Sequence, residues 1–147
     1  MAAPFRILLV DDDETISKIL LEALRLHGYE GVSWVPDGRK AVEAYRTLRP
    51  DVVLMDITMP VMDGYEASCR IKAFDPDARL VVLTGNSGDP RARRILHEGV
   101  AECVIQKPIR LNDLRAVIER PGSGVASGEP CAHAFQAAGG STAFGAA

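Results

Sequence analysis

Four short runs of the chain are continuously apolar, at Ile7–Val10, Val52–Met55, Leu80–Leu83 and Cys103–Ile105. A strand with one face in water alternates apolar and polar residues, whereas a continuous run is typical of a strand buried on both faces, as in a parallel sheet covered by helices. A weaker strand is expected at Gly31–Val35. The pattern therefore predicts five strands.

Between the strands, apolar residues recur at the three- and four-residue spacing of a helix. The positions concerned are Ile16, Ile19, Leu20, Ala23 and Leu24; Ala41, Val42 and Tyr45; Ala67, Ile71 and Phe74; Ala92, Ile95 and Leu96; and Leu111, Leu114, Val117 and Ile118. Strands that alternate with helices predict an α/β fold, here (βα)5 with right-handed crossovers. Ligands of such sheets bind at the carboxyl ends of the strands.

The overall composition is that of an ordinary globular domain. The chain has 17 Lys and Arg against 20 Asp and Glu, a net charge of −3, 25% charged and 47% hydrophobic residues. These values exclude a collagen, a coiled-coil rod and a wholly disordered chain, and they give no electrostatic reason to expect nucleic acid or a membrane as partner. Because no membrane-spanning stretch, signal peptide or disulfide pattern is present, we expect a cytoplasmic location.

The composition changes near Arg120. Residues 121–147 contain no Lys, Arg, Leu or Ile and only one acidic residue, Glu129, whereas Gly, Ala and Ser dominate. Such a segment buries too little apolar surface to offset its chain entropy. We therefore predict one domain over residues 1–120 and a flexible tail over 121–147.

Charged and polar residues follow four of the predicted strands. Asp11 and Asp12 follow the first, Asp56 ends the third, Thr84 ends the fourth and Lys107 follows the fifth. In a parallel sheet these ends lie at one edge, where clustered carboxylates repel unless a cation joins them, and oxygen ligands suit Mg²⁺. A carboxylate beside a metal, a lysine and a hydroxyl suits phosphoryl chemistry, with Asp56 as the nucleophile that forms an aspartyl phosphate.

The residues that carry this chemistry resemble the receiver domains of two-component response regulators, in particular the single-domain chemotaxis type. The matching segments are Ile7–Glu14, Asp51–Gly64, Val82–Gly85 and Lys107–Pro108, in the order and spacing of that family over roughly residues 5–120. The resemblance implies a flavodoxin-like, doubly wound sheet with the strand order 2-1-3-4-5.

The resemblance also implies roles for individual residues. Asp56 would be the phosphoacceptor, supplied by a histidine kinase or a histidine phosphotransfer protein. Asp11, Asp12 and Asp56, with the backbone carbonyl of Thr58, would bind Mg²⁺. Lys107 would contact the phosphoryl group, with a cis peptide bond to the proline after it.

The switch implied by the resemblance departs from the family at one position. Thr84 would move toward the new phosphoryl oxygens, and the side chains of Thr58 and Asn86 would tune the lifetime of the phosphorylated state. Many receivers carry an aromatic residue three positions before the lysine, but here that residue is Val104. The interval from Gly99 to Lys107 is also one residue longer than is common, which favours a bulge or a longer loop before the last strand.

A receiver of this kind would be a signalling switch rather than a metabolic enzyme, with self-catalysed phosphoryl transfer and dephosphorylation only. Its output would come from a downstream protein at the face formed by the helix near Ala92–Leu96, the strand Cys103–Ile105 and the helix Leu111–Ile118, and a homodimer could form on phosphorylation. Two alternatives are an unphosphorylated binding module and a phosphotransferase of the haloacid dehalogenase type. The latter usually has an acid two residues after the nucleophile, where this chain has Thr58.

Other polar residues favour structural roles. Asp13 and Asp63 are expected at helix starts and turns. The arginines at positions 91, 93 and 94 are expected on a solvated helix face, with partner docking second. Trp34 is expected at the sheet edge.

Overall fold

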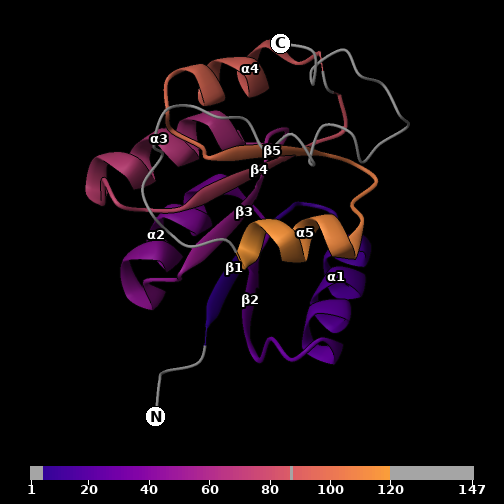
Figure 1. The fold of residues 1–147 in the computed structure, drawn as a ribbon. Coiled ribbons are helices and arrows are strands. Elements are labelled where there is room, and N and C mark those ends of the chain that lie inside the picture. Colours follow the sequence, from indigo (N-terminus) through magenta and orange to yellow (C-terminus); the bar gives the residue numbers. More distant parts are fainter. Residues whose placement is uncertain (1–4, 87, 120–147) are drawn as a thin grey trace.

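A computed structural model describes residues 5–86 and 88–119 (Figure 1). Strands and helices alternate in the order β1 (Arg6–Val10), α1 (Glu14–Leu26), β2 (Gly31–Val35), α2 (Gly38–Leu48), β3 (Val52–Asp56), α3 (Gly64–Phe74), β4 (Leu80–Thr84), α4 (Pro90–His97), β5 (Cys103–Gln106) and α5 (Leu111–Ile118). The predicted strands and helices are confirmed. The tail predicted over 121–147 lies outside the described residues.

The strands form one parallel sheet in the order β2-β1-β3-β4-β5, which confirms the predicted topology. In the registers that pair them, Val10 lies opposite Met55, Asp56 opposite Leu83 and Thr84 opposite Gln106. All strands therefore end at one edge of the sheet, which we call the carboxyl edge. The opposite edge, where the strands begin, is the amino edge.

Two apolar clusters fill the two faces of the sheet. Leu8, Val53 and Val82 point toward α2, α3 and α4, whereas Leu9 and Leu54 point toward α1 and α5. In Figure 1 the two groups of helices accordingly lie on opposite sides of the strands. This double cover is why the strand sequences are continuously apolar. In the described part of the chain, no helix combines the length and apolarity needed to cross a membrane.

Aspartates begin four of the helices. Asp13, Asp37, Asp63 and Asp89 are the N-cap residues of α1 to α4, and each carboxylate accepts a hydrogen bond from a backbone N–H of the first turn. These bonds satisfy amide groups that have no partner within the helix. The structural roles predicted for Asp13 and Asp63 are confirmed.

The additional residue before β5 lies in the preceding loop. Strand β5 pairs with β4 in unbroken register from Cys103 to Gln106, so the strand has no bulge there. The loop runs from Gly99 to Glu102, and Glu102 N–H donates to the Leu80 carbonyl as the strand begins. Val104 is fully buried in the core on the α4 side.

Candidate functional site

Three carboxylates meet at the carboxyl edge. Asp11, Asp12 and Asp56 each offer a ligand oxygen, and these oxygens lie within 4.8 Å of one another. Asp11 and Asp56 are buried, and Asp12 is exposed to solvent. An open set of oxygen donors at this spacing suits a hard divalent cation that keeps several waters, as Mg²⁺ does. The structure thus brings together the three predicted metal-ligating carboxylates.

Lys107 lies against the two buried carboxylates. Its Nζ is 3.0 Å from Asp11 Oδ2 and 3.4 Å from Asp56 Oδ2. The peptide bond from Lys107 to Pro108 is cis, as the resemblance implies. One lysine faces three carboxylates, so the cluster has an excess of negative charge.

Burial and the neighbouring charges together shift the pKa values of the cluster. Burial, with the neighbouring charge of Asp11, raises the pKa of Asp56 to about 6, although Lys107 acts in the opposite sense. Burial lowers the pKa of Lys107, but the attraction of Asp56 and Asp11 outweighs it, and the net shift is upward. A carboxylate that is costly to keep charged is stabilised by an added cation.

The loop after Asp56 is held close to the acceptor by backbone contacts. Gly64 N–H donates to the Ile57 carbonyl at 2.9 Å, and a Cβ on Gly64 would lie 2.1 Å from the Asp56 carbonyl oxygen. Only glycine fits there. Within the loop, Val61 is 87% exposed and has φ of 69°, a conformation that is strained for a β-branched residue. The predicted turn at Asp63 and Gly64 is therefore also a close support of the acceptor.

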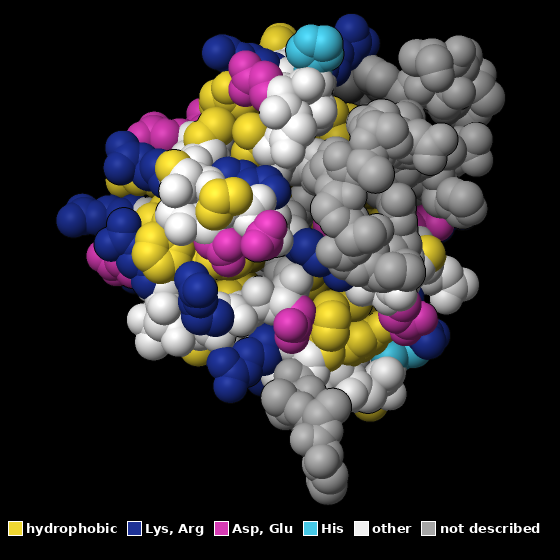
Figure 2. All heavy atoms as spheres, turned by 60° about the vertical axis from the view of Figure 1, so that its left-hand side comes forward, with side chains coloured by type: hydrophobic (Ala, Val, Ile, Leu, Met, Phe, Trp, Pro, Cys, Tyr) yellow, Lys and Arg dark blue, Asp and Glu magenta, His cyan; other side chains and the backbone are white. Residues whose placement is uncertain are grey.

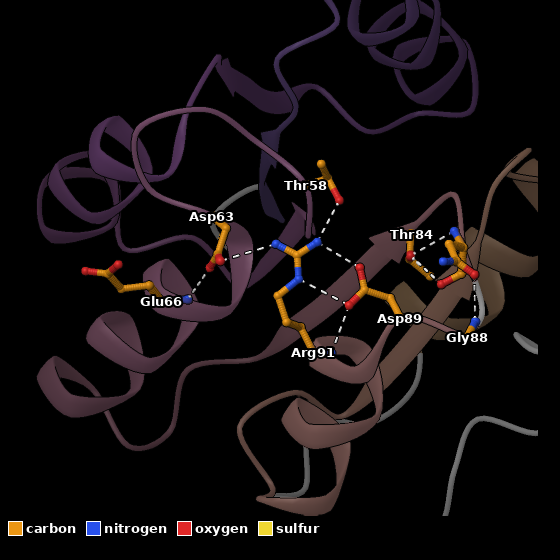
Figure 3. Close-up of polar contacts among 8 residues, drawn as sticks. Thr58, Asp63, Glu66, Thr84, Gly88, Asp89 and Arg91 are labelled. Carbon is orange, nitrogen blue, oxygen red and sulfur yellow. Dashed lines mark hydrogen bonds and ion pairs between the residues drawn. The ribbon is translucent and has the colours of Figure 1, made fainter.

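Thr84 is buried at the end of β4, and its hydroxyl is turned to the following loop. Thr84 Oγ1 donates to the Asn86 carbonyl at 2.9 Å and accepts from the Asn86 N–H at 3.0 Å (Figure 3). The side chain of Asn86 in turn accepts from the Gly88 N–H at 2.9 Å. The two residues predicted to sense and tune phosphorylation thus form one turn between β4 and α4.

The prediction of a solvated helix face holds only in part for Arg91, whose side chain is 37% exposed but is bound to other segments. Its guanidinium is bound to Asp89, Asp63 and Thr58 beside the loop that follows β3 (Figure 3). Arg93 and Arg94 are exposed as predicted. On the face shown in Figure 2, basic side chains lie beside acidic ones, in keeping with the ion pairs Arg70–Glu66 and Arg94–Glu98 of α3 and α4.

Sequence reasoning missed two contacts of the site because each joins residues far apart in the chain. Arg91 reaches Thr58 across 33 positions, and Trp34 Nε1 donates to the Asp11 carbonyl at 2.8 Å across 23. The prediction of Trp34 at the edge strand is correct, but it gave no partner. The position of Arg91 two residues after the N-cap residue Asp89 could have indicated that the two side chains pair.

An apolar groove borders the cluster between α1 and the segment that follows β5. Its volume is about 320 Å³, and it is lined by Ile16, Ile19, Leu20, Ala23, Lys107, Pro108, Ile109 and Leu111. Lys107 is therefore shared between the groove and the carboxylate cluster.

Comparison with known proteins identifies the family. The model of the response regulator receiver domain matches residues 7–119. The chain belongs to the response regulator receiver domain family. It is a receiver domain of two-component systems, and the resemblance drawn from the sequence is confirmed.

Individual relatives agree with this family. The chain is 37% identical to the chemotaxis protein CheY of Treponema pallidum over 82% of its own length and 83% of that protein. Among solved structures, it resembles that of the CheX–CheY–BeF3–Mg²⁺ complex of Borrelia burgdorferi, with a TM-score of 0.71, 31% identity and coverage of 78% and 87% of the two chains. It also resembles the response regulator TrrA of Thermotoga maritima in complex with Mg²⁺-BeF, with a TM-score of 0.69, 28% identity and coverage of 79% and 97%.

Proposed function

We propose that this receiver is a phosphorylation-dependent signalling switch in which Asp56 accepts the phosphoryl group. The observation that carries the proposal is the position of Asp56, a buried carboxylate 3.4 Å from Lys107 and within 4.8 Å of two further carboxylates. A structural ion pair would balance its charges, whereas this cluster leaves a nucleophile beside a fixed cation and an open set of metal ligands.

The reaction follows from these groups. An Asp56 carboxylate oxygen attacks phosphorus in the phosphohistidine of a kinase or phosphotransfer protein. The new O–P bond forms as the P–N bond breaks, and the released imidazole nitrogen takes up a proton. Lys107 neutralises charge on the phosphoryl oxygens. When the switch returns to its unphosphorylated state, water attacks phosphorus, the O–P bond breaks, and inorganic phosphate leaves.

Asp11, Asp12, Asp56 and the backbone carbonyl of Thr58 are the groups that would hold Mg²⁺. The fit rests on the donor set, which is all oxygen, partly open to solvent and negatively charged beyond what Lys107 neutralises. When bound, the ion would supply a second positive charge for the phosphoryl oxygens.

The output would pass through Thr84 to the face formed by α4, β5 and α5, where we place a downstream protein. Two features support this path. Thr84 ends the strand before α4, and its hydroxyl bonds the Asn86 backbone at the base of that helix. Because the buried residue three positions before Lys107 is Val104, the switch operates without an aromatic ring at that point.

The phosphoryl donor must reach Asp56 at the carboxyl edge. The apolar groove beside Lys107 offers a contact surface there, with Ile16 and Ile19 exposed on α1. A homodimer formed on phosphorylation is a second form of output, which size-exclusion chromatography of the phosphorylated protein tests.

The deciding experiment is labelling by acetyl phosphate, with and without Mg²⁺, followed by intact mass. We expect Mg²⁺-dependent addition of one phosphoryl group to the natural protein and to the control Asp77→Asn, which alters an exposed aspartate far along the chain from the cluster. We expect no addition to Asp56→Asn. The decay of the label gives the lifetime of the switch.

Other outcomes separate the alternatives. A folded protein that binds Mg²⁺ but takes no label would contradict the switch and favour an unphosphorylated binding module. Rapid turnover of many phosphate esters would favour a phosphotransferase of the haloacid dehalogenase type. That type usually has an acid two residues after the nucleophile, where this chain has the exposed Thr58.

A further inference from the structure

Arg91 joins three separate segments at the carboxyl edge. Its Nη2 donates to Thr58 Oγ1 at 3.0 Å and to Asp89 Oδ2 at 2.8 Å, and its Nη1 donates to Asp63 Oδ2 at 3.2 Å (Figure 3). Its Nε adds a bond to Asp89 Oδ1 at 3.1 Å. One side chain in the first turn of α4 is thus bound to the loop after β3, to the N-cap of α3 and to the N-cap of its own helix.

The geometry of these contacts requires an arginine. The planar guanidinium directs donors toward several acceptors at once, which a lysine ammonium cannot do in one position. Its hydrogen bonds to Asp89 raise the pKa of Arg91, and the bond from Arg91 lowers the pKa of Asp89. Two carboxylates already neutralise Arg91, so it is held as a brace and is not a spare cation for the phosphoryl group.

Thr58 connects this brace to the phosphoacceptor. Thr58 lies two residues after Asp56 in the loop that follows β3, and its side-chain oxygen accepts a hydrogen bond from Arg91. Thr58 is otherwise exposed to solvent. The Arg91 contact therefore adds a restraint on Thr58 to the backbone bonds that hold this loop at Ile57 and Gly64.

We propose that Arg91 is a positioning residue for phosphoryl transfer at Asp56 and acts through Thr58. This inference rests on the function proposed above. Because Arg91 belongs to α4, a protein that displaces α4 also loosens Thr58, and the chemistry at Asp56 then responds to output binding. The link between acceptor and helix runs through a polar brace on the outside of the molecule, separate from the buried Thr84.

The test compares rate constants for phosphorylation by acetyl phosphate and for loss of the label. We expect Arg91→Ala to slow phosphorylation about tenfold and to slow label loss as well, since both reactions use the same positioned groups. Arg91→Lys keeps the charge and should show most of the same loss. The control Arg94→Ala removes an exposed arginine of the same helix, paired with Glu98, and should leave both rates unchanged.

A double-variant cycle distinguishes positioning from a general structural role. Thr58→Val removes the hydroxyl acceptor at nearly constant shape. If Arg91 acts through Thr58, adding Arg91→Ala to Thr58→Val changes the rates little, whereas independent effects would multiply. If the effects of Thr58→Val and Arg91→Ala multiply, or if folded Arg91→Ala and Arg91→Lys keep unchanged rates, the inference about Arg91 is overturned while the proposed function stands. Unlabelled natural protein would overturn the proposed function itself.

Discussion

Two clusters of charged side chains lie at low exposure at opposite edges of the same sheet. At the amino edge, Arg79 binds Glu102 through two hydrogen bonds of 2.9 and 3.1 Å and also donates to the Val117 carbonyl at 2.9 Å. At the carboxyl edge, Lys107 faces Asp11 and Asp56. These five side chains are each less than a quarter exposed.

The difference between them lies in the balance of charge and of hydrogen bonds. The Arg79–Glu102 pair is neutral, and Arg79 also satisfies carbonyl groups at the end of α5, as a structural ion pair should. The carboxyl-edge cluster has more carboxylates than cations, and burial, with the charge of Asp11, raises the pKa of Asp56. Burial alone therefore does not mark a functional site, whereas burial with unbalanced charge does.

The largest expected effect is at the amino edge. Arg79→Met leaves Glu102 without its bidentate partner and the end of α5 without donors, so we expect a loss of about 3 kcal/mol in the free energy of unfolding, measured with urea. The control Lys18→Met breaks an exposed ion pair with Glu14 and should change this free energy by less than about 0.5 kcal/mol. Equal changes in the free energy of unfolding for the two substitutions would contradict a structural role of Arg79.

At the carboxyl edge, we expect removal of a charge to raise the free energy of unfolding instead of lowering it. With EDTA present, Asp56→Asn removes a buried, repelled carboxylate and should raise the free energy of unfolding near neutral pH by about 2 kcal/mol. Asp56 has a raised pKa in the folded protein, so its native form binds the proton more tightly than the unfolded chain does, and stability falls as pH rises between about 4 and 6. The gain should therefore vanish toward pH 4. A variant less stable than the natural protein near neutral pH would contradict this.

Mg²⁺ should act on one edge only. At ten times its dissociation constant, it should stabilise the natural protein by about 1.4 kcal/mol through preferential binding to the folded state. Arg79→Met, altered at the other edge, should gain the same amount, and Asp12→Asn should gain less. Thermal unfolding with Mg²⁺ against EDTA measures all three. Equal gains in Asp12→Asn and the natural protein would place the ion elsewhere.

The smallest effect concerns backbone strain. Val61 at the carboxyl edge and Arg49 before β3 at the amino edge both have positive φ, but only Val61 is β-branched. Val61→Asn should raise the free energy of unfolding by about 1 kcal/mol, because asparagine tolerates this conformation and the exposed valine loses no packing. Arg49→Asn should change it by less than about 0.5 kcal/mol, since it also loses the contact of Arg49 with the Phe74 ring. Similar gains at both positions would contradict a strain specific to Val61.

The order and type of the elements could be predicted because the strands are buried on both faces. A continuous run such as Val52–Met55 has few other interpretations, and parallel strands then bring Asp11, Asp56 and Lys107 to one edge. Periodicity and strand-end position thus predicted the donor set, whereas the strand order came only from the resemblance.

Contacts made by single side chains could not be predicted in this way. Whether Arg91 faces water or Thr58 depends on how α4 is rotated and how the loop after β3 lies, and a helical pattern fixes neither. Whether the extra residue before β5 forms a bulge or lengthens the loop likewise depends on how β5 pairs with β4, and the sequence alone does not reveal this pairing. Such details follow from packing between distant segments.

The bond from Trp34 to Asp11 gives the molecule an intrinsic optical probe. Trp34 is the chain's one tryptophan, and its indole N–H donates to the backbone carbonyl of a residue whose carboxylate belongs to the cluster. The side chain is partly exposed on β2, so its fluorescence depends on both solvent and this bond. Events at the carboxylates can therefore be followed by emission from an edge strand, with no dye attached and no residue of the cluster altered.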